Sequence, residues 1–317
     1  MRLDEGTGGV VLAVTRRRSR RFYGQRKECV PEAQPSRITS NNIRAFPPPL
    51  RLKEPQRPDR FGAHAGCITR RSTPSSPARV NLILFESSET NSPLPRHDSR
   101  AAHILDVLRR KVGDTVDTGL IDGPRGKATV TAVTADSVAL SFAWDKQSPP
   151  PLAPISILVG LPRPQTVKKI LHAATELGVA ALHFVTTEKS EPGYAQSTLW
   201  SSGEWRRHLL DAAQQAFDTR LPDVSNGRKL AETLAALEQH STRIALDNYE
   251  SPQSLSAVAV AAPVVLAIGP ERGWSARDRD LLRAQGFAFA HLGQRVLRSE
   301  TAAIASLAIV RSKLGLI

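Results

Sequence analysis

The sequence predicts an α/β protein in which a small β-rich module precedes a larger domain built on a parallel sheet. Residues 80–147 contain several strand-like segments but only one helix-like segment. From Ile155 onward, strand-like and helix-like segments alternate, which is typical of a parallel sheet with helices on both faces. The proline-rich segment 148–154 separates the two regions and predicts a stiff linker at a domain boundary.

The first 79 residues carry most of the positive charge. The chain has a formal net charge of +13, of which 17 basic and 6 acidic residues in 1–79 contribute +11. This segment contains nine prolines and no sustained apolar period, so we expect a disordered basic extension. Its composition fits an organelle transit peptide, which implies import. The alternative is upstream sequence from a wrongly assigned start, since Met1 is the only methionine, and it implies a cytoplasmic protein.

Residues 80–317 lack the features of several protein classes. Both cysteines, Cys29 and Cys67, lie in the extension, which excludes a disulfide framework and a cysteine metal site from the remainder. No stretch approaches the roughly 20 consecutive apolar residues of a membrane-spanning helix. We therefore expect neither a membrane nor a metal among the partners.

The small module should begin with a strand over 80–85 and continue with one amphipathic helix. Asp98 is a candidate N-cap for this helix and Gly113 marks its end. One face of the helix would carry Ala101, Leu105, Leu108 and Val112. Three strands rich in valine and threonine follow, at 115–121, 127–133 and 137–143.

The larger domain should have its strands at 155–159, 181–185, 243–246, 264–268 and 287–292. The helices between and after them are predicted at 165–177, 204–217, 276–284 and 301–314. Open sheets of this kind bind ligands beyond the carboxyl ends of their strands.

Two glycine loops stand at such strand ends. The strand 264–268 runs into Gly269-Pro270-Glu271-Arg272-Gly273, and the next strand runs into a loop that contains Gly293. One such loop alone is more typical of an ordinary strand–helix turn, whereas two on consecutive parallel strands predict a joint pocket. Neither loop has the dinucleotide fingerprint or the Walker phosphate motif, which favours a ligand with few or no phosphates.

The combined motifs resemble the 16S ribosomal RNA uridine-N3 methyltransferase family, of the SPOUT class of knotted methyltransferases. They are Gly269-Pro270-Glu271-x-Gly273 and Leu292-Gly293-x-Arg295-Val296-Leu297-Arg298-x-Glu300-Thr301-Ala302. His103-x-x-x-Val107-Leu108-Arg109-x-x-x-Gly113-Asp114 is similar to the family's PUA-like RNA-binding barrel. Thr175–Val179 and Glu188-Lys189-Ser190 resemble its central stretch. One departure is Arg272, where the family often has glycine, so an arginine there either narrows the loop or contacts RNA.

The resemblance extends over about 80–317, and its implications are specific. It implies a PUA-like barrel, a C-terminal trefoil knot that holds S-adenosylmethionine, and a homodimer packed through the knot helices. The substrate would be 16S ribosomal RNA within the small ribosomal subunit. The residues expected to bind the cofactor are Leu266, Ile268, Gly269, Pro270, Glu271, Gly273, Leu292, Gly293, Val296, Leu297 and Thr301.

Arg298 and Glu300 are the candidate catalytic residues. Arg298 would stabilise a uracil anion or hold a phosphate. Glu300 would remove the N3 proton or orient Arg298, and the plain alternative is an acid that stabilises its helix N-terminus.

A basic cluster in the small module is the candidate RNA-binding surface. Its members are Arg96, His103, Arg109, Arg110, Lys111, Arg125 and Lys127. Because residues 80–317 have a net charge of only +2, this local concentration favours phosphate contacts over a merely solvated face. Lys168 and Lys169 would extend it. Three tryptophans would stack on a base or have a core or interface role: Trp200, Trp205 and Trp274.

Two other functions remain open at this point. One is a SPOUT methyltransferase that acts on another RNA or another atom. The other is a non-catalytic ribosome-binding protein that has kept the fold.

Overall fold

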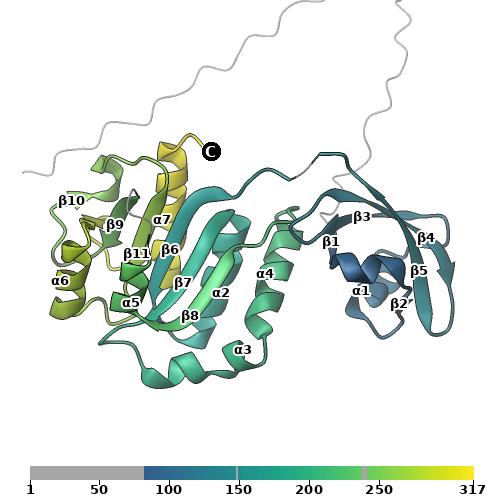
Figure 1. Cartoon of the computed structure of the whole chain (residues 1–317), viewed down its shortest axis with the longest axis horizontal. Coiled ribbons are helices and arrows are strands. Elements are labelled where there is room, and N and C mark those ends of the chain that lie inside the picture. Colours follow the sequence, from purple (N-terminus) through teal and green to yellow (C-terminus); the bar gives the residue numbers. More distant parts are fainter. Residues whose placement is uncertain (1–81, 148, 238–240) are drawn as a thin grey trace, which may run out of the picture. The chain divides into compact units, whose positions relative to one another are not determined.

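The computed structural model describes residues 82–147, 149–237 and 241–317. These residues form two sheets, one of five and one of seven strands (Figure 1). The predicted disordered extension over 1–79 lies outside the described residues. None of the helices in the described part of the chain has the length and apolar character needed to cross a membrane.

The five-stranded sheet curls around a small core. Its strands are β1 (Leu82–Phe85), β2 (Leu94–Pro95), β3 (Thr115–Leu120), β4 (Arg125–Val133) and β5 (Ser137–Trp144). They lie in the order β1-β3-β4-β5-β2, in which β1 and β3 are parallel and the other pairs antiparallel. The core contains Ile83, Phe85, Ile104, Val116 and Val130. This module confirms the predicted β-rich region with its strands in nearly the expected places.

The helix of this module is shorter than predicted. After a 3₁₀ turn, η1 (Ser87–Asn91), α1 spans Ser99–Ala102 and continues into one π-helical turn, η2 (His103–Val107). Asp98 is the N-cap, as expected, and accepts a hydrogen bond from the Arg100 backbone amide at 2.8 Å. The prediction of a helix to Gly113 was wrong because Arg109 adopts a left-handed φ of 54° and reverses the chain. Val112, expected on the inner face, is therefore 60 % exposed.

The seven-stranded sheet confirms the predicted parallel architecture. Its strands are β6 (Ala153–Gly160), β7 (Val179–Thr186), β8 (Asp223–Lys229), β9 (Thr242–Leu246), β10 (Gln253–Ser254), β11 (Val264–Ile268) and β12 (Ala288–His291). They lie in the order β10-β12-β9-β11-β6-β7-β8, and every recorded pair is parallel. Strand β6 begins at Ala153, inside the segment predicted as linker. The sequence did not predict β8 and β10, because β10 has two residues and the edge strand β8 is polar (DVSNGRK).

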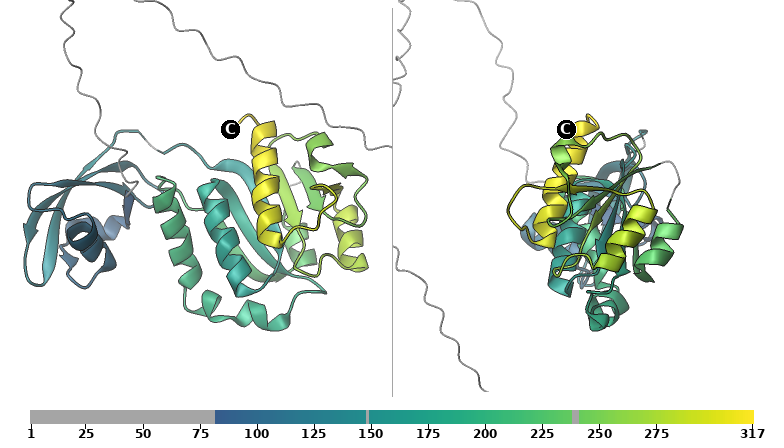
Figure 2. Two further views of the ribbon diagram at one scale, coloured as in Figure 1. Left: turned by 180° about the vertical axis from the view of Figure 1, so that it is seen from behind. Right: turned by 90° about the vertical axis from the view of Figure 1, so that its left-hand side faces the viewer.

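Helices cover both faces of this sheet (Figure 2). They are α2 (Pro164–Glu176), α3 (Thr198–Ser201), α4 (Glu204–Gln215), α5 (Leu230–Ala235), α6 (Ala276–Ala284) and α7 (Ser299–Lys313), with 3₁₀ turns η3 (Pro192–Gln196) and η4 (Leu255–Ala257). Successive residues of β11 alternate between the faces. Leu266 packs in the core cluster that also holds residues of α2, α4 and α7, and Val265 packs in the cluster with residues of α5 and α6.

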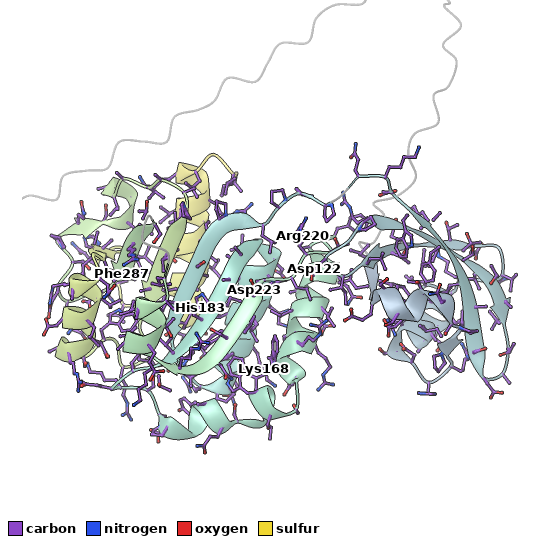
Figure 3. All side chains as sticks on the ribbon, in the orientation of Figure 1. Asp122, Lys168, His183, Arg220, Asp223 and Phe287 are labelled. Carbon is purple, nitrogen blue, oxygen red and sulfur yellow. The ribbon has the colours of Figure 1, made fainter. Side chains whose placement is uncertain are left out.

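Side-chain hydrogen bonds support the connections between these elements, and Figure 3 labels two of the side chains that make them, Arg220 and His183. Arg220 donates to the backbone carbonyls of Pro149 at 3.4 Å and Pro150 at 3.1 Å, which ties the entry to β6. His183 of β7 is 2.8 Å from Ser225 Oγ of β8, and this contact supports the polar edge strand. Burial, together with the charge of Arg228, lowers the pKa of His183, which favours the neutral imidazole there.

Candidate functional site

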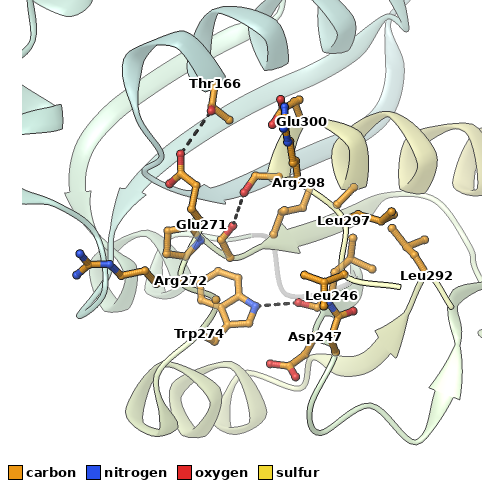
Figure 4. A pocket seen from close by; sticks show the side chains of 18 of the residues that line it. Thr166, Leu246, Asp247, Glu271, Arg272, Trp274, Leu292, Leu297, Arg298 and Glu300 are labelled. Atoms are coloured by element: carbon orange, nitrogen blue, oxygen red, sulfur yellow. Dashed lines mark hydrogen bonds between the residues drawn. The ribbon is translucent and has the colours of Figure 1, made fainter. Parts of the chain in front are cut away.

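A cavity of about 860 Å³ lies beyond the carboxyl ends of three neighbouring strands, β9, β11 and β12 (Figure 4). The loops that follow these strands line it at 246–249, 268–274 and 291–298, with gaps in the last. The start of α2 supplies Arg163, Gln165, Thr166 and Lys169, and the start of α7 supplies Ser299, Glu300 and Ala302. The position agrees with the edge at which parallel sheets bind ligands, and the volume is that of a small-molecule site, ~300–1,000 Å³.

The floor of the cavity is apolar. Leu246 and Ile268 end β9 and β11, and both are buried. Leu292 and Leu297 from the loop after β12 also line it (Figure 4). A floor of this kind suits the flat face of a nucleobase, while the polar groups on the walls fix its orientation.

Trp274 is part of the framework under the cavity. It is 1 % exposed, and its indole N–H donates to the Leu246 carbonyl at 3.0 Å, which joins the loops after β9 and β11. Trp200 packs at 5.3 Å from the ring of Phe184, and Trp205 contacts the same core cluster. Of the predicted roles, the core role is therefore confirmed for Trp274, which is too buried to stack on a base. Trp200 and Trp205 are partly buried and pack against the core.

The loop after β11 is a tight turn packed closely on β6. The Gly273 amide donates to the Pro270 carbonyl at 2.8 Å, and Gly273 has a φ of 66°, which favours glycine. Gly160 at the end of β6 allows the close approach, because a Cβ there would lie 2.4 Å from Pro270 Cδ. Lys189 Nζ holds the turn by donating to the carbonyls of Trp274 at 2.9 Å and Arg272 at 3.3 Å.

Glu271 connects the same turn to α2. Its Oε1 accepts hydrogen bonds from the Arg163 backbone amide at 3.1 Å, from Arg163 Nε at 3.4 Å and from Thr166 Oγ1 at 3.4 Å. A carboxylate at this position satisfies the exposed amides of the helix N-terminus and interacts favourably with its dipole. Glu271 lines the cavity as predicted, but its carboxylate is engaged with the protein.

The loop after β9 was missing from the predicted site. Asp247 is buried, and its Oδ1 accepts from the backbone amides of Tyr249 at 2.6 Å and Glu250 at 3.0 Å. Its Oδ2 accepts from Arg279 Nε of α6 at 2.7 Å, so that a buried ion pair fixes the loop. Tyr249 is 82 % exposed at the rim. The signal that was present in the sequence is Asp-Asn directly after a predicted strand, since both residues favour turns.

Eight of the eleven predicted cofactor residues line the cavity: Ile268, Gly269, Pro270, Glu271, Gly273, Leu292, Val296 and Leu297. The other three do not. Leu266 is fully buried in the core, and Thr301 is exposed on α7. Gly293 has a φ of 107°, and nothing lies within 4 Å of a Cβ built there, so the backbone conformation explains this glycine better than close packing does.

Arg298 and Glu300 lie together at the start of α7, as predicted (Figure 4). The Glu300 side chain is 13 % exposed, and its Oε1 accepts from Lys169 Nζ of α2 at 2.9 Å. Burial raises the pKa of the Glu300 carboxyl. The hydrogen bonds from Lys169 and the backbone, with the charges of Lys169 and Arg298, outweigh burial and hold the pKa below its ordinary value. Glu300 is therefore an ionised partner of Lys169.

The charges on the cavity wall follow a simple pattern. Its three carboxylates each have a cationic partner: Asp247 has Arg279, Glu271 has Arg163, and Glu300 has Lys169. Arg272 and Arg298, by contrast, have no hydrogen bond or ion pair from their side chains within the described ranges. The cavity thus keeps two cations that are not directly paired with a carboxylate in the described ranges, each on a different loop.

The predicted RNA-binding residues have different surroundings. Three of them have partners: Arg96 lies 3.8 Å from Asp106, Lys127 lies 2.5 Å from Asp117, and Arg125 donates to the Phe217 carbonyl at 3.3 Å. Arg109, Arg110 and Lys111 are exposed, and their side chains make no ion pair in the described part of the chain. His103 lines a separate cavity of about 340 Å³ with Ser99 and Arg100.

The described residues contain no group of three or more His, Cys, Asp or Glu side chains placed to hold a metal ion.

Comparison with known proteins identifies the family. The sequence profile of the RNA methyltransferase domain matches residues 148–311. A ribosomal RNA small subunit methyltransferase E from Treponema pallidum is 32 % identical over 241 residues, which cover 73 % of this chain and 90 % of that protein. The protein of the same name from Synechocystis is 28 % identical over 254 residues, covering 78 % and 82 %. The chain belongs to the ribosomal RNA small subunit methyltransferase E family.

Solved structures confirm the fold. The methyltransferase E from Neisseria gonorrhoeae, solved with S-adenosyl methionine, superposes with a TM-score of 0.60 at 20 % identity and covers 73 % of this chain and 97 % of that one. A predicted RNA methyltransferase from Thermotoga maritima gives a TM-score of 0.57 at 25 % identity, covering 74 % and 100 %. The family's SPOUT domain with its preceding PUA-like module is therefore the fold of this chain, as the resemblance implied.

The close packing of the β11 loop on β6 leads to a testable prediction. In Gly160→Ala, the new Cβ meets the ring and backbone of Pro270, so the turn must shift. Overpacking of this kind costs ~1–3 kcal/mol, and we expect urea unfolding to show a loss in that range. Hydrogen exchange of the amides at 269–274 should accelerate.

Gly193→Ala is the matched control, because nothing lies within 4 Å of a Cβ at Gly193. That variant should show only the small stabilisation that comes from restricting the unfolded chain. Equal stability of the two variants would contradict the proposed packing.

Proposed function

We propose that this protein transfers a methyl group from S-adenosylmethionine to N3 of a uridine in 16S ribosomal RNA of the small ribosomal subunit. The observation that carries the proposal is the cavity at the ends of β9, β11 and β12. It is lined by both loops that resemble the uridine-N3 family and by two arginines without a carboxylate partner among the described residues, Arg272 and Arg298. Family membership supports the class of reaction and the RNA substrate.

The cavity fits the cofactor on several grounds. Its volume of about 860 Å³ is sufficient for a nucleoside with an amino acid attached. Leu246, Ile268 and Leu292 offer apolar surface for an adenine, and the turn at 269–273 exposes backbone groups for hydrogen bonds. A Cβ at Gly269 would lie 3.2 Å from the Gly273 backbone, which is tighter than ordinary contact, so the close packing favours glycine at this position. When bound, S-adenosylmethionine supplies an electrophilic methyl group on a positively charged sulfur.

The residues of α7 and α2 would prepare the uracil. N3 of uracil carries a proton, and its loss leaves negative charge on the ring and its carbonyl oxygens. Arg298, which has no partner among the described residues, would donate to a carbonyl oxygen and stabilise that charge. A nearby cation also lowers the pKa of the N3 proton, so that solvent is a sufficient acceptor.

Glu300 would serve as a positioning residue and not as the base. Its lowered pKa makes the carboxylate a weak proton acceptor at neutral pH, far from the matched pKa that general bases have. Its ion pair with Lys169 joins α7 to α2 and keeps the two helices in register beside the cavity. Of the three predicted roles for Glu300, we favour orientation of Arg298, which would act indirectly, because the ion pair with Lys169 holds the end of α7 that begins after Arg298.

The RNA would approach across a surface with several exposed cations. Arg109, Arg110 and Lys111 are suited to phosphate contacts, because their side chains have no acidic partners in the described ranges. Lys127 and Arg96 would have to exchange Asp117 and Asp106 for phosphates, which reduces their net contribution.

A homodimer packed through α7 forms part of the proposal. Residues of α7 are apolar on most sides: Ala303, Leu307 and Val310 are buried in the core, while Ile304 on another side is 46 % exposed. A helix that is apolar all round is normally buried, so a second copy of the chain would cover the exposed side.

The function is tested by assay and mass spectrometry. Small ribosomal subunits from a strain that lacks this protein should accept one methyl group per 16S RNA when they are incubated with the protein and S-adenosylmethionine. Digestion of the RNA after this reaction should yield 3-methyluridine. RNA from the same subunits before the reaction should contain none at that position. Methyl transfer to another atom or to another RNA would select the wider SPOUT alternative, and cofactor binding without transfer would select the non-catalytic one.

Arg298 and Glu300 should differ in their effects on the rate. Arg298→Ala should lower the single-turnover rate ~10²–10³-fold, as loss of a charge-stabilising donor does, with cofactor affinity in calorimetry changed only a few-fold. Glu300→Gln should lower the rate less than tenfold, because it weakens the contact with Lys169 but leaves Arg298 in place.

The pH profile separates the two roles of Glu300. Because its contacts hold the pKa of Glu300 below the ordinary value of a glutamate carboxyl, Glu300 stays ionised around neutral pH, and the wild-type profile should show no limb from this group there. An acidic limb near neutral pH that disappears in Glu300→Gln would identify it as the base after all.

The dimer is tested by sedimentation equilibrium. Wild-type protein should sediment as a dimer, and Ile304→Glu should shift it to a monomer, because a carboxylate cannot be buried unpaired in the interface. Val133→Glu places the same charge at a valine that is 41 % exposed in the five-stranded sheet, and it should leave the dimer intact. A dimer in both variants would place the interface elsewhere.

A further inference from the structure

Arg272 stands at the tip of the turn after β11. The hydrogen bond from the Gly273 amide to the Pro270 carbonyl closes this turn, so that Glu271 and Arg272 are its two central residues. The φ of Arg272 is not in the left-handed region, and the turn therefore accepts an arginine without strain. Its side chain is exposed and points away from Leu292 and Leu297 in Figure 4. Narrowing of the loop, one predicted effect of this residue, is thus not what its geometry indicates.

A second, smaller cavity of about 160 Å³ lies beside the main one. Arg163, Glu271 and Arg272 line both cavities, so the turn forms a ridge between them. The other residues that line the smaller cavity are Leu161, Lys189, Glu191 and Tyr194. Its volume is well below the ~300 Å³ at which small-molecule sites begin, which suits a compact group and not a nucleoside.

The charges around this smaller cavity favour an anion. Three cations and two carboxylates line it: Arg163, Lys189 and Arg272, and Glu191 and Glu271. Glu271 is already engaged by Arg163 and the start of α2. Lys189 donates only to backbone carbonyls, so no carboxylate neutralises its charge there. Lys189 and Arg272 together therefore face the single carboxylate of Glu191, and an excess of positive charge remains.

We propose that the smaller cavity binds a backbone phosphate of the RNA strand next to the target nucleotide, with Arg272 as its principal ligand. The inference rests on the proposed function, in which the target base enters the main cavity. Arg272 and Arg298 stand on different loops around that cavity, one free to hold the strand and the other to meet the base. The planar guanidinium of Arg272 matches a phosphate with two parallel hydrogen bonds, and Lys189 adds a point charge.

The test compares Arg272→Gln and Arg272→Lys in equilibrium binding to unmethylated small ribosomal subunits at several potassium chloride concentrations. Arg272→Gln removes one phosphate contact, so we expect about tenfold weaker binding and a salt slope smaller by about 0.7–0.9. Arg272→Lys keeps the charge and should restore the slope with a loss of a few-fold in affinity. Cofactor affinity, measured by calorimetry, should stay within twofold in both variants.

Arg277→Gln is the matched control. Arg277 is on α6, its side chain is 78 % exposed, and it lines neither cavity, although it lies 3.6 Å from Glu188. Loss of its charge should leave both the affinity and the salt slope at wild-type values. An equal loss of slope in Arg277→Gln and Arg272→Gln would overturn a specific site and indicate general attraction of the surface to RNA.

The remaining outcomes distinguish this inference from the proposed function. If wild-type protein methylates the subunits and Arg272→Gln leaves the salt slope of binding unchanged, the phosphate site alone is overturned. A large loss of cofactor affinity in Arg272→Gln would also overturn it, by assigning Arg272 to the main cavity. Wild-type protein that neither binds nor methylates the subunits would overturn the proposed function and this inference with it.

Discussion

The buried ion pair between Asp247 and Arg279 organises the site. Asp247 follows β9 and Arg279 lies in α6, so their contact fixes the loop after β9 against the helix that follows the loop after β11. The hydrogen bond from Trp274 to Leu246 joins the same two loops from below. Such a pair contributes little net stability, because desolvation offsets the attraction, but removal of one partner costs ~3–5 kcal/mol. Its effect is to select one arrangement of the loops, and the walls of the cavity depend on that arrangement.

Local sequence was sufficient for the elements that have a strong period or a clear stop signal. The buried strands β6 and β11, the helices α2 and α7 and the two glycine loops all lie within a few residues of their predicted positions. The edge strand β8 escaped because a polar edge strand has no apolar pattern, and the helix after Asp98 ended early because Arg109 took a left-handed conformation that its neighbours do not signal. The site predicted from the sequence was incomplete for a different reason, because it depends on contacts between distant parts of the chain. Lys169 and Glu300 are 131 residues apart, and only the packing of α7 on α2 brings them together.

The distribution of charge around the cavity is more informative than the net charge of the chain. Each carboxylate that lines the cavity is neutralised by a partner, so acidic residues there shape the walls and do not repel an anionic substrate. The arginines without partners, Arg272 and Arg298, stand on two different loops, and in each case the backbone places the side chain at the edge of the cavity. The net charge of +13 is a poor guide to the site, because +11 of it belongs to residues 1–79 and only +2 to residues 80–317, which contain the cavity.

The attachment of Glu271 to the start of α2 affects how small molecules enter and leave the cavity. An outward movement of the turn that carries Glu271 would break the contacts of Glu271 with Arg163 and Thr166 and leave a helix end uncapped, at a cost of ~1 kcal/mol. The contacts from Lys189 to the same turn would be lost as well. These contacts suit the turn to be a wall of the cavity and not a lid. Tyr249 and Val296 also line the cavity and are both largely exposed, so they mark the mouth through which a small molecule can leave. Anything that covers that mouth, including a bound macromolecule, would hold the contents of the cavity in place until it departs.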